Sequence, residues 1–133
     1  MTDKQKRLAV ERYAKAIQVA LKLDDWSIRF EWADLDENEQ SRCWYLPEYR
    51  KGTVQFDNAF IKESPADIRL IVIHVFVHAH LERFDSFVRY LIKELSPTAQ
   101  TMANEQARIT VEEATTVFSG LLESGMPPFN WPK

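Results

Sequence analysis

The stretch from Ile68 to Phe84, IRLIVIHVFVHAHLERF, decides the organisation of this chain of 133 residues. It contains all three histidines of the sequence, His74, His78 and His80. His74 and His78 are spaced i, i+4, so on a helix they lie on one face about one turn apart. Two imidazoles held in this way can share one tetrahedral metal ion. The stretch therefore predicts a helix that carries half of a metal site.

The segment from His74 to His78 reads HVFVH and departs at one position from the HExxH motif of zinc hydrolases. In HExxH, the Glu that follows the first His is the general base. Val75 stands at that position here, and a valine cannot accept a proton. It lies about 100° round the helix from His74, where the base would face the cleft. We therefore expect Val75 to form an apolar part of the cleft wall.

The residues before this stretch predict where its helix begins. Ser64-Pro65-Ala66-Asp67 offers an N-cap, a proline for the first turn and a carboxylate near the helix N-terminus. The β-branched run IVIHVFV alone would also suit a buried strand. The apolar spacing nevertheless continues to Ile92 and stops only at Ser96-Pro97, which favours a long helix with room for a bend at Asp85-Ser86.

The rest of the chain predicts an α+β fold in a single domain, residues 1–133. An amphipathic helix is expected over Lys4–Leu23 and a second long helix from Thr98 or Gln100 to Leu122. Alternating patterns predict about three strands in a small antiparallel sheet, over Trp26–Trp32, Arg42–Leu46 and Gly52–Asp57. The proline-rich tail, residues 125–133, should be extended and held to the body by Phe129 and Trp131.

Composition excludes several classes of function. The net charge of −3 and the scattered basic residues argue against binding to nucleic acid. The single Cys43 excludes an internal disulfide, suits a reducing compartment and is interpreted as a packing residue. The N-terminus lacks an apolar signal core, and the longest apolar run is interrupted by His74. We expect a cytoplasmic protein without a membrane span.

A zinc site of this type needs a third ligand from the protein. Glu82 follows His74 by eight residues, about 12 Å along a helix axis, which is too far for a shared metal. Among the remaining acidic residues Glu112 is favoured and Glu113 is the reserve, because Glu112 lies beside the small residues of the last helix that permit close helix approach. On that helix the expected buried stripe is Val111, Ala114, Phe118, Leu121 and Leu122. The alternative is a pair of structural histidines with no metal, and His80 is expected to point away from the pair.

The expected hydrophobic core draws on all three predicted helices and on two of the three predicted strands. It comprises Ile17, Leu21, Trp26, Ile28, Phe30, Val54, Phe56, Leu70, Ile73, Val77, Phe118 and Leu122.

The order of the segments resembles the small zincin-like metallopeptidases of phages and prophages, minimal relatives of the gluzincins. The likeness is carried by LKLDDWSIRFEW, GTVQFDNAFI, SPADIRLIVIHVFVHAHLERF and NEQARITVEEATTVFSGLL, in that order. It implies that zinc is held by His74, His78 and Glu112. It also implies that the strand before the histidine helix borders the cleft, so a partner should bind there by strand addition. The residues of that strand are Thr53, Val54, Gln55, Phe56 and Asp57.

The valine at position 75 shapes the function that we expect. A positioned acid–base group is worth about 10²–10⁴ in rate, so its loss should leave little peptidase activity. The expectation is a metal-binding pseudo-peptidase that acts by binding a protein or peptide partner, a host protein if the origin is a phage. The alternatives are an active zinc metallopeptidase with an atypical base and a metal-free interaction protein.

Overall fold

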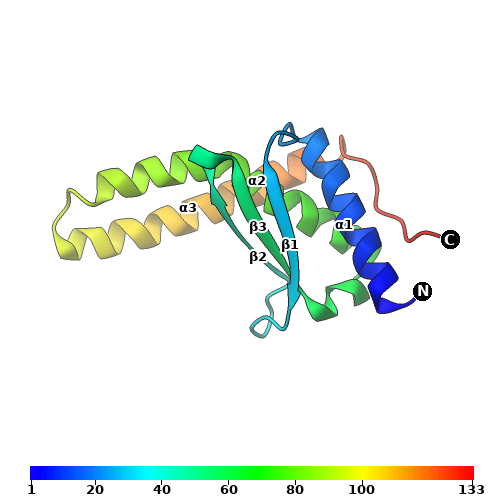
Figure 1. The fold of residues 1–133 in the computed structure, drawn as a ribbon. Coiled ribbons are helices and arrows are strands. Elements are labelled where there is room, and N and C mark those ends of the chain that lie inside the picture. The colour runs from blue at the N-terminus through cyan, green and yellow to red at the C-terminus, as the bar shows by residue number, and fades with distance from the viewer.

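The computed structural model covers residues 1–133 and has the predicted α+β composition (Figure 1). A helix precedes three strands, and two long helices follow them. The elements in chain order are α1 (Asp3–Ala20), β1 (Ser27–Ala33), β2 (Ser41–Leu46), the 3₁₀ turn η1 (Pro47–Tyr49), β3 (Lys51–Asp57), the 3₁₀ turn η2 (Asn58–Lys62), α2 (Pro65–Ile92) and α3 (Pro97–Glu123).

Each helix begins at a side-chain cap that the sequence supplies. Thr2 and Gln5 form a reciprocal capping box at the start of α1. Ser64 and Ser96 are the N-caps of α2 and α3, and each side chain accepts a hydrogen bond from the backbone N–H three residues further on. Each of these serines is followed by a proline. The helix α2 is continuous over its 28 residues, so Asp85-Ser86 does not interrupt it.

The sheet is mixed, so the prediction of a purely antiparallel sheet is wrong for one of its two pairs. The strand order is β1-β3-β2: β2 runs antiparallel to β3, whereas β1 runs parallel to it. Residues of β3 such as Val54 and Phe56 are fully buried, while nearly all of β1 and β2 is partly buried or exposed. The most buried strand is thus the central one, and the chain inserts it between two strands that precede it.

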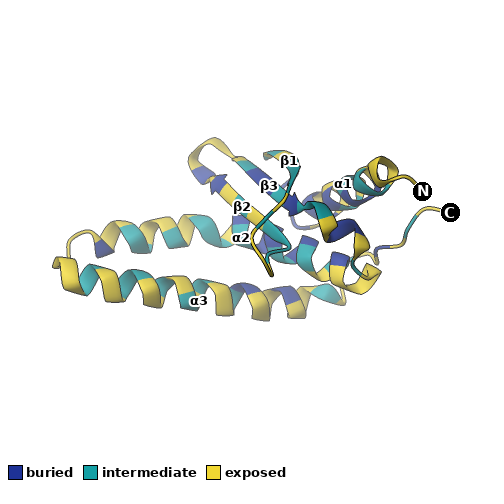
Figure 2. Ribbon diagram, turned by 90° about the horizontal axis from the view of Figure 1, so that it is seen from below, coloured by how far each residue is buried: buried dark blue, intermediate teal, exposed yellow.

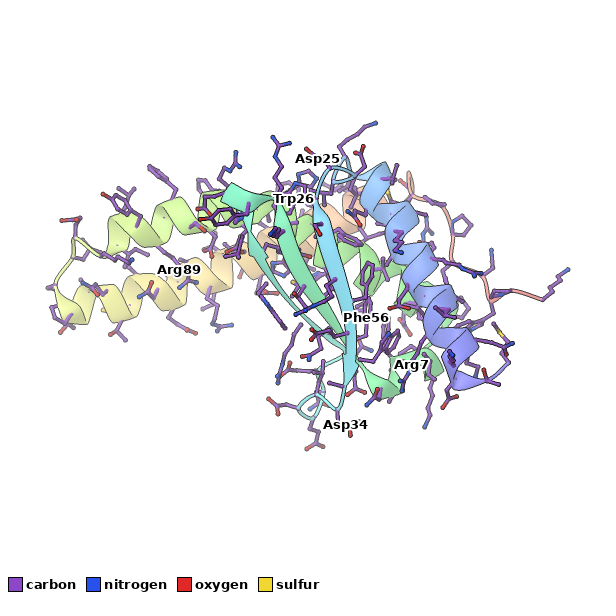
Figure 3. The ribbon with its side chains drawn as sticks, in the orientation of Figure 1. Arg7, Asp25, Trp26, Asp34, Phe56 and Arg89 are labelled. Carbon is purple, nitrogen blue, oxygen red and sulfur yellow. The ribbon has the colours of Figure 1, made fainter.

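The core lies between the sheet and the helices α1 and α2. Its members include Val10 and Ile17 of α1, Phe56 of β3, and Val72 and Phe76 of α2. In Figure 3 Phe56 is labelled between the sheet and α1. Of the predicted core, Trp26, Ile28 and Phe30 are partly buried and pack against this cluster.

Three predicted core residues are exposed instead, because the body covers a different side of their helices. Leu70, Phe118 and Leu122 are 38%, 45% and 37% exposed. On α3 only Thr115 and Ser119 are fully buried, where small side chains let the two helices come close. The predicted buried stripe of α3 is therefore wrong: its members are partly or largely open to solvent, namely Val111, Ala114, Phe118, Leu121 and Leu122.

The helices α2 and α3 form a hairpin whose connected end projects beyond the sheet (Figures 1 and 2). Inside the projecting part Arg89 binds Asp85 one turn earlier at 3.2 Å, and its guanidinium donates to Asn104 of α3 at 3.3 Å (Figure 3). Neither helix of the hairpin, nor α1, is long and apolar enough to cross a membrane.

The C-terminal tail folds back beside α1 (Figure 1). Phe129 is buried, and its ring packs edge-on against those of Tyr13 and Trp131 at 5.1 and 4.8 Å. The Tyr13 hydroxyl donates to the Pro127 carbonyl at 2.7 Å.

Candidate metal centre

Three side chains from two helices converge on one point between α2 and α3. The Glu112 carboxylate of α3 lies 3.1 Å from Nε2 of His78 and 3.6 Å from Nε2 of His74. The two imidazole rings stand 4.9 Å apart at 72° on successive turns of α2. One ligand atom from each residue falls within 4.8 Å of the others, so the group could hold a metal ion.

Local packing explains why Glu112 reaches the histidines. The small buried residues Thr115 and Ser119 lie one and two turns beyond it on α3 and allow the helices to approach. Their hydroxyls donate to the carbonyls of Val111 and Thr115 within the same helix, which satisfies them without a partner on α2. Glu112 itself remains about half exposed, whereas His74 and His78 are only 24% and 17% exposed.

Burial sets the protonation state of the pair. It lowers the pKa of His74 and of His78 below the usual value of 6.5, against the opposing pull of Glu112. For His78 the neighbouring His74 lowers the pKa further. Both imidazoles are therefore neutral at pH 7, and the neutral ring is the form that ligates a metal. The contacts to Glu112 are therefore contacts of neutral rings and not ion pairs.

The donor set of two imidazoles and one carboxylate could hold a metal ion. Ligand bonds of about 2.0–2.2 Å in a tetrahedral site place ligand atoms roughly 3.3–3.6 Å apart. The contacts of 3.1 Å from Glu112 Oε1 to His78 and of 3.6 Å from Oε2 to His74 lie near that spacing, and all three ligand atoms fall within 4.8 Å of one another. The group contains Glu112 and does not contain Glu113, the reserve ligand. His80 is also outside it: its Nε2 lies 2.5 Å from the Leu21 carbonyl.

Val75 does not line an open cleft. Its side chain is 1% exposed and belongs to the hydrophobic core beneath the sheet. The position that would carry the general base therefore faces packed apolar groups, because β2 lies directly over this part of α2. The expectation of an apolar cleft wall is wrong on this point.

Tyr45 of β2 fixes the strand against the histidine helix, a role the sequence analysis did not foresee. Its buried hydroxyl donates to the Val75 carbonyl at 2.5 Å, between the two histidine turns. Burial, with Cys43 nearby, raises the pKa of this hydroxyl well above 10, so it remains a donor. The inward position of Tyr45 in the alternating strand was the available signal, but the strand pattern does not reveal a helix carbonyl as the partner.

Two further groups border the centre. Burial raises the pKa of the Cys43 thiol to about 12, and the nearby carboxylates of Glu112 and Glu82 act in the same direction. The thiol is thus protonated at neutral pH and unsuited to be a nucleophile. Burial also raises the pKa of Glu82, which stands one turn beyond His78 on α2.

The strand Thr53–Asp57 cannot accept another strand. It is most of β3, which pairs with β1 on one side and β2 on the other. Thr53, Val54 and Phe56 are buried, while Gln55 and Asp57 are partly exposed. Asp57 accepts hydrogen bonds from the backbone N–H groups of Leu35 and Ala59, which gives it a structural role. Strand addition at these residues is therefore excluded, because both edges of β3 are already in use.

Comparisons with known proteins add no family to this geometry: no family model, no curated protein and no solved structure matches the chain.

Proposed function

We propose that this chain binds one zinc ion through His74, His78 and Glu112, in a zincin-like arrangement that lacks the usual general base. The observation that supports it most is the Glu112 carboxylate, which reaches both imidazoles from a separate helix. Two neutral imidazoles and one carboxylate are the ligand set of several catalytic zinc sites. A zinc ion bound there supplies a Lewis acid.

We further propose that the protein works by binding an extended segment of another protein and not by cleaving it. Val75 offers no proton acceptor, and its surroundings leave no room for one in the folded state. The edge strand β2 pairs only with β3, so its other edge is open to a peptide. That edge lies over α2 close to the histidines, as the bond from Tyr45 to Val75 indicates.

A specific observation favours a second function, peptide hydrolysis with Glu82 as the base. Glu82 follows His78 by one helical turn, and burial raises its pKa. A raised carboxyl pKa brings a group closer to the range that suits a general base at neutral pH.

Metal analysis of the purified chain tests the metal centre. In zinc-supplemented buffer we expect about one zinc per chain, the stoichiometry of a three-ligand site. His78→Ala and Glu112→Gln should each abolish binding. The matched controls are His80→Ala and Glu113→Gln, which remove the same chemical groups beside the site and should retain the zinc. A native chain that folds normally and takes up no zinc refutes the proposal.

A cleavage assay on an unstructured protein substrate, with and without chelator, separates the two functions. The proposed binding role requires that the zinc-loaded native chain leaves the substrate intact while retaining it in a pull-down. Cleavage that chelator and Glu82→Gln both abolish would instead establish the hydrolase.

A further inference from the structure

The projecting half of the α2–α3 hairpin carries a continuous apolar face without a partner in the chain. On α2 the residues Phe84, Phe87 and Leu91 recur at intervals of three and four and are 64%, 58% and 51% exposed. Residues recurring at such intervals share one side of a helix. This side of α2 differs from the side that carries the metal ligands, since His74 and His78 point toward Glu112 on α3.

Beside these large side chains the two helices enclose an open groove of about 360 Å³. The apolar side chains that line it are mostly larger on α2 than on α3. They are Phe84, Val88 and Ile92 of α2, and Ala103, Ala107 and Val111 of α3. We call this groove and the adjoining Phe87 and Leu91 the hairpin face. It presents bulky groups and, next to them, a hollow floored by alanines.

A surface that has both bulky groups and a hollow can fit a second copy of itself. A two-fold axis places the same surface of two copies together, so that each residue i that contacts j is matched by j contacting i. The bulky groups on α2 of one copy can thus enter the alanine-floored groove of the other, and four helices then pack as a bundle. A partner with a flat or uniformly bulky surface would leave the groove unfilled.

The charge of the hairpin also favours a second copy of the chain as the partner. Acidic and basic side chains are equal in number between residues 81 and 110, so the hairpin is neutral and does not select a strongly charged partner. They are Glu82, Asp85, Glu94 and Glu105 against Arg83, Arg89, Lys93 and Arg108. Two neutral copies meet without the like-charge repulsion that would oppose pairing.

The exposed area corresponds to a weak, transient dimer. The three half-exposed side chains Phe84, Phe87 and Leu91 present roughly 100 Å² each, and the partly exposed lining of the groove adds a smaller area, so the hairpin face offers roughly 400 Å². Two copies together would bury about 800 Å², which is the size of a weak interface. We propose that the hairpin face is the contact between two copies of this chain, which form a two-fold dimer through a four-helix bundle. This proposal does not depend on the metal centre.

Sedimentation of the full chain over a concentration series tests the dimer. We expect a reversible dimer, with a dissociation constant that Phe84→Glu raises by a factor of about 30 or more, as for a central interface residue. The matched control is Tyr90→Glu on the same helix. Tyr90 is also 64% exposed, but it lies about 120° round the helix from Phe84 and does not line the groove. It should leave the dissociation constant unchanged.

A second pair of variants tests the groove itself. Ala107→Trp fills the hollow and should weaken the dimer, whereas Thr116→Trp adds the same group at an exposed position of α3 outside the groove and should not. Helix content measured by circular dichroism should be unchanged in all four variants, since each altered residue is at least partly open to solvent.

Three outcomes would overturn the proposal. One is a native chain that remains monomeric at sub-millimolar concentration. Another is a dimer that Phe84→Glu and Ala107→Trp leave intact. The third is equal weakening by Phe84→Glu and Tyr90→Glu, which would indicate nonspecific association of the hairpin.

Discussion

At the scale of single residues, the metal centre depends on a carboxylate that reaches across from a separate helix. The i, i+4 spacing predicted the histidine pair, since helix geometry alone fixes that relation. Glu112 could be chosen over Glu113 because it borders the small residues of α3. The surroundings of Val75 could not be predicted in this way. The position of a residue on a helix fixes the direction in which its side chain points. Whether the side chain reaches solvent depends on how the sheet packs against the helix.

The burial of Val75 has a measurable consequence for stability. Val75→Glu places a carboxylate among apolar side chains without a charged partner, which should cost about 3–5 kcal/mol in the free energy of unfolding. Leu70→Glu is the matched control: the same change on α2, at a side chain that is 38% exposed, should cost far less. Urea unfolding followed by circular dichroism gives both values. Equal small losses would mean that position 75 opens into a wet cleft after all.

At the scale of elements, local patterns predicted which segments are helices and strands, and long-range packing decided how they associate. Caps and apolar spacing located α2 and α3, because these signals act within a few residues. The parallel pairing of β1 with β3 left no local signal, since it joins residues about two dozen positions apart. The apolar stripe of α3 was identified correctly as apolar but wrongly as covered. Hydrophobicity marks a face that favours burial, but the fold leaves this one partly or largely open to solvent.

Gly52 of β3 shows how one backbone position supports the contact between β2 and α2. A Cβ atom at Gly52 would clash with the buried ring of Tyr45 and crowd Ile28. Gly52→Ala should therefore displace the ring, weaken its bond to the Val75 carbonyl and lower the free energy of unfolding by about 1–3 kcal/mol. Thermal unfolding measures the loss.

The double variant Gly52→Ala/Tyr45→Leu provides the control for that prediction. With the ring removed, the added methyl group has space. Gly52→Ala should therefore cost less stability in the Tyr45→Leu background than in the native chain. Strictly additive losses would show that the clash with Tyr45 is not the cause.

At the scale of the whole molecule, the two ends of the chain meet. The tail that follows α3 lies beside α1 (Figure 1), and Arg69 of α2 donates to the carbonyls of Glu123 and Met126 where α3 ends. The sequence predicted that Phe129 is held to the body, because an aromatic residue in a proline-rich tail has a strong tendency to be buried. It did not predict α1 as the docking site, since that contact spans almost the full length of the chain.

Phe129 should therefore be as important to stability as a residue of the central core. Its side chain is 4% exposed and packs against Tyr13 of α1 and Trp131 of the tail. Phe129→Ala should lower the free energy of unfolding by about 3–5 kcal/mol, the usual loss for a buried phenylalanine. Tyr49→Ala removes an aromatic ring that is 71% exposed and should change it by about 0.5 kcal/mol or less. If Phe129→Ala is as mild as Tyr49→Ala, the tail is not docked in solution, and α1 must be held to the body mainly by its contacts with α2 and η2.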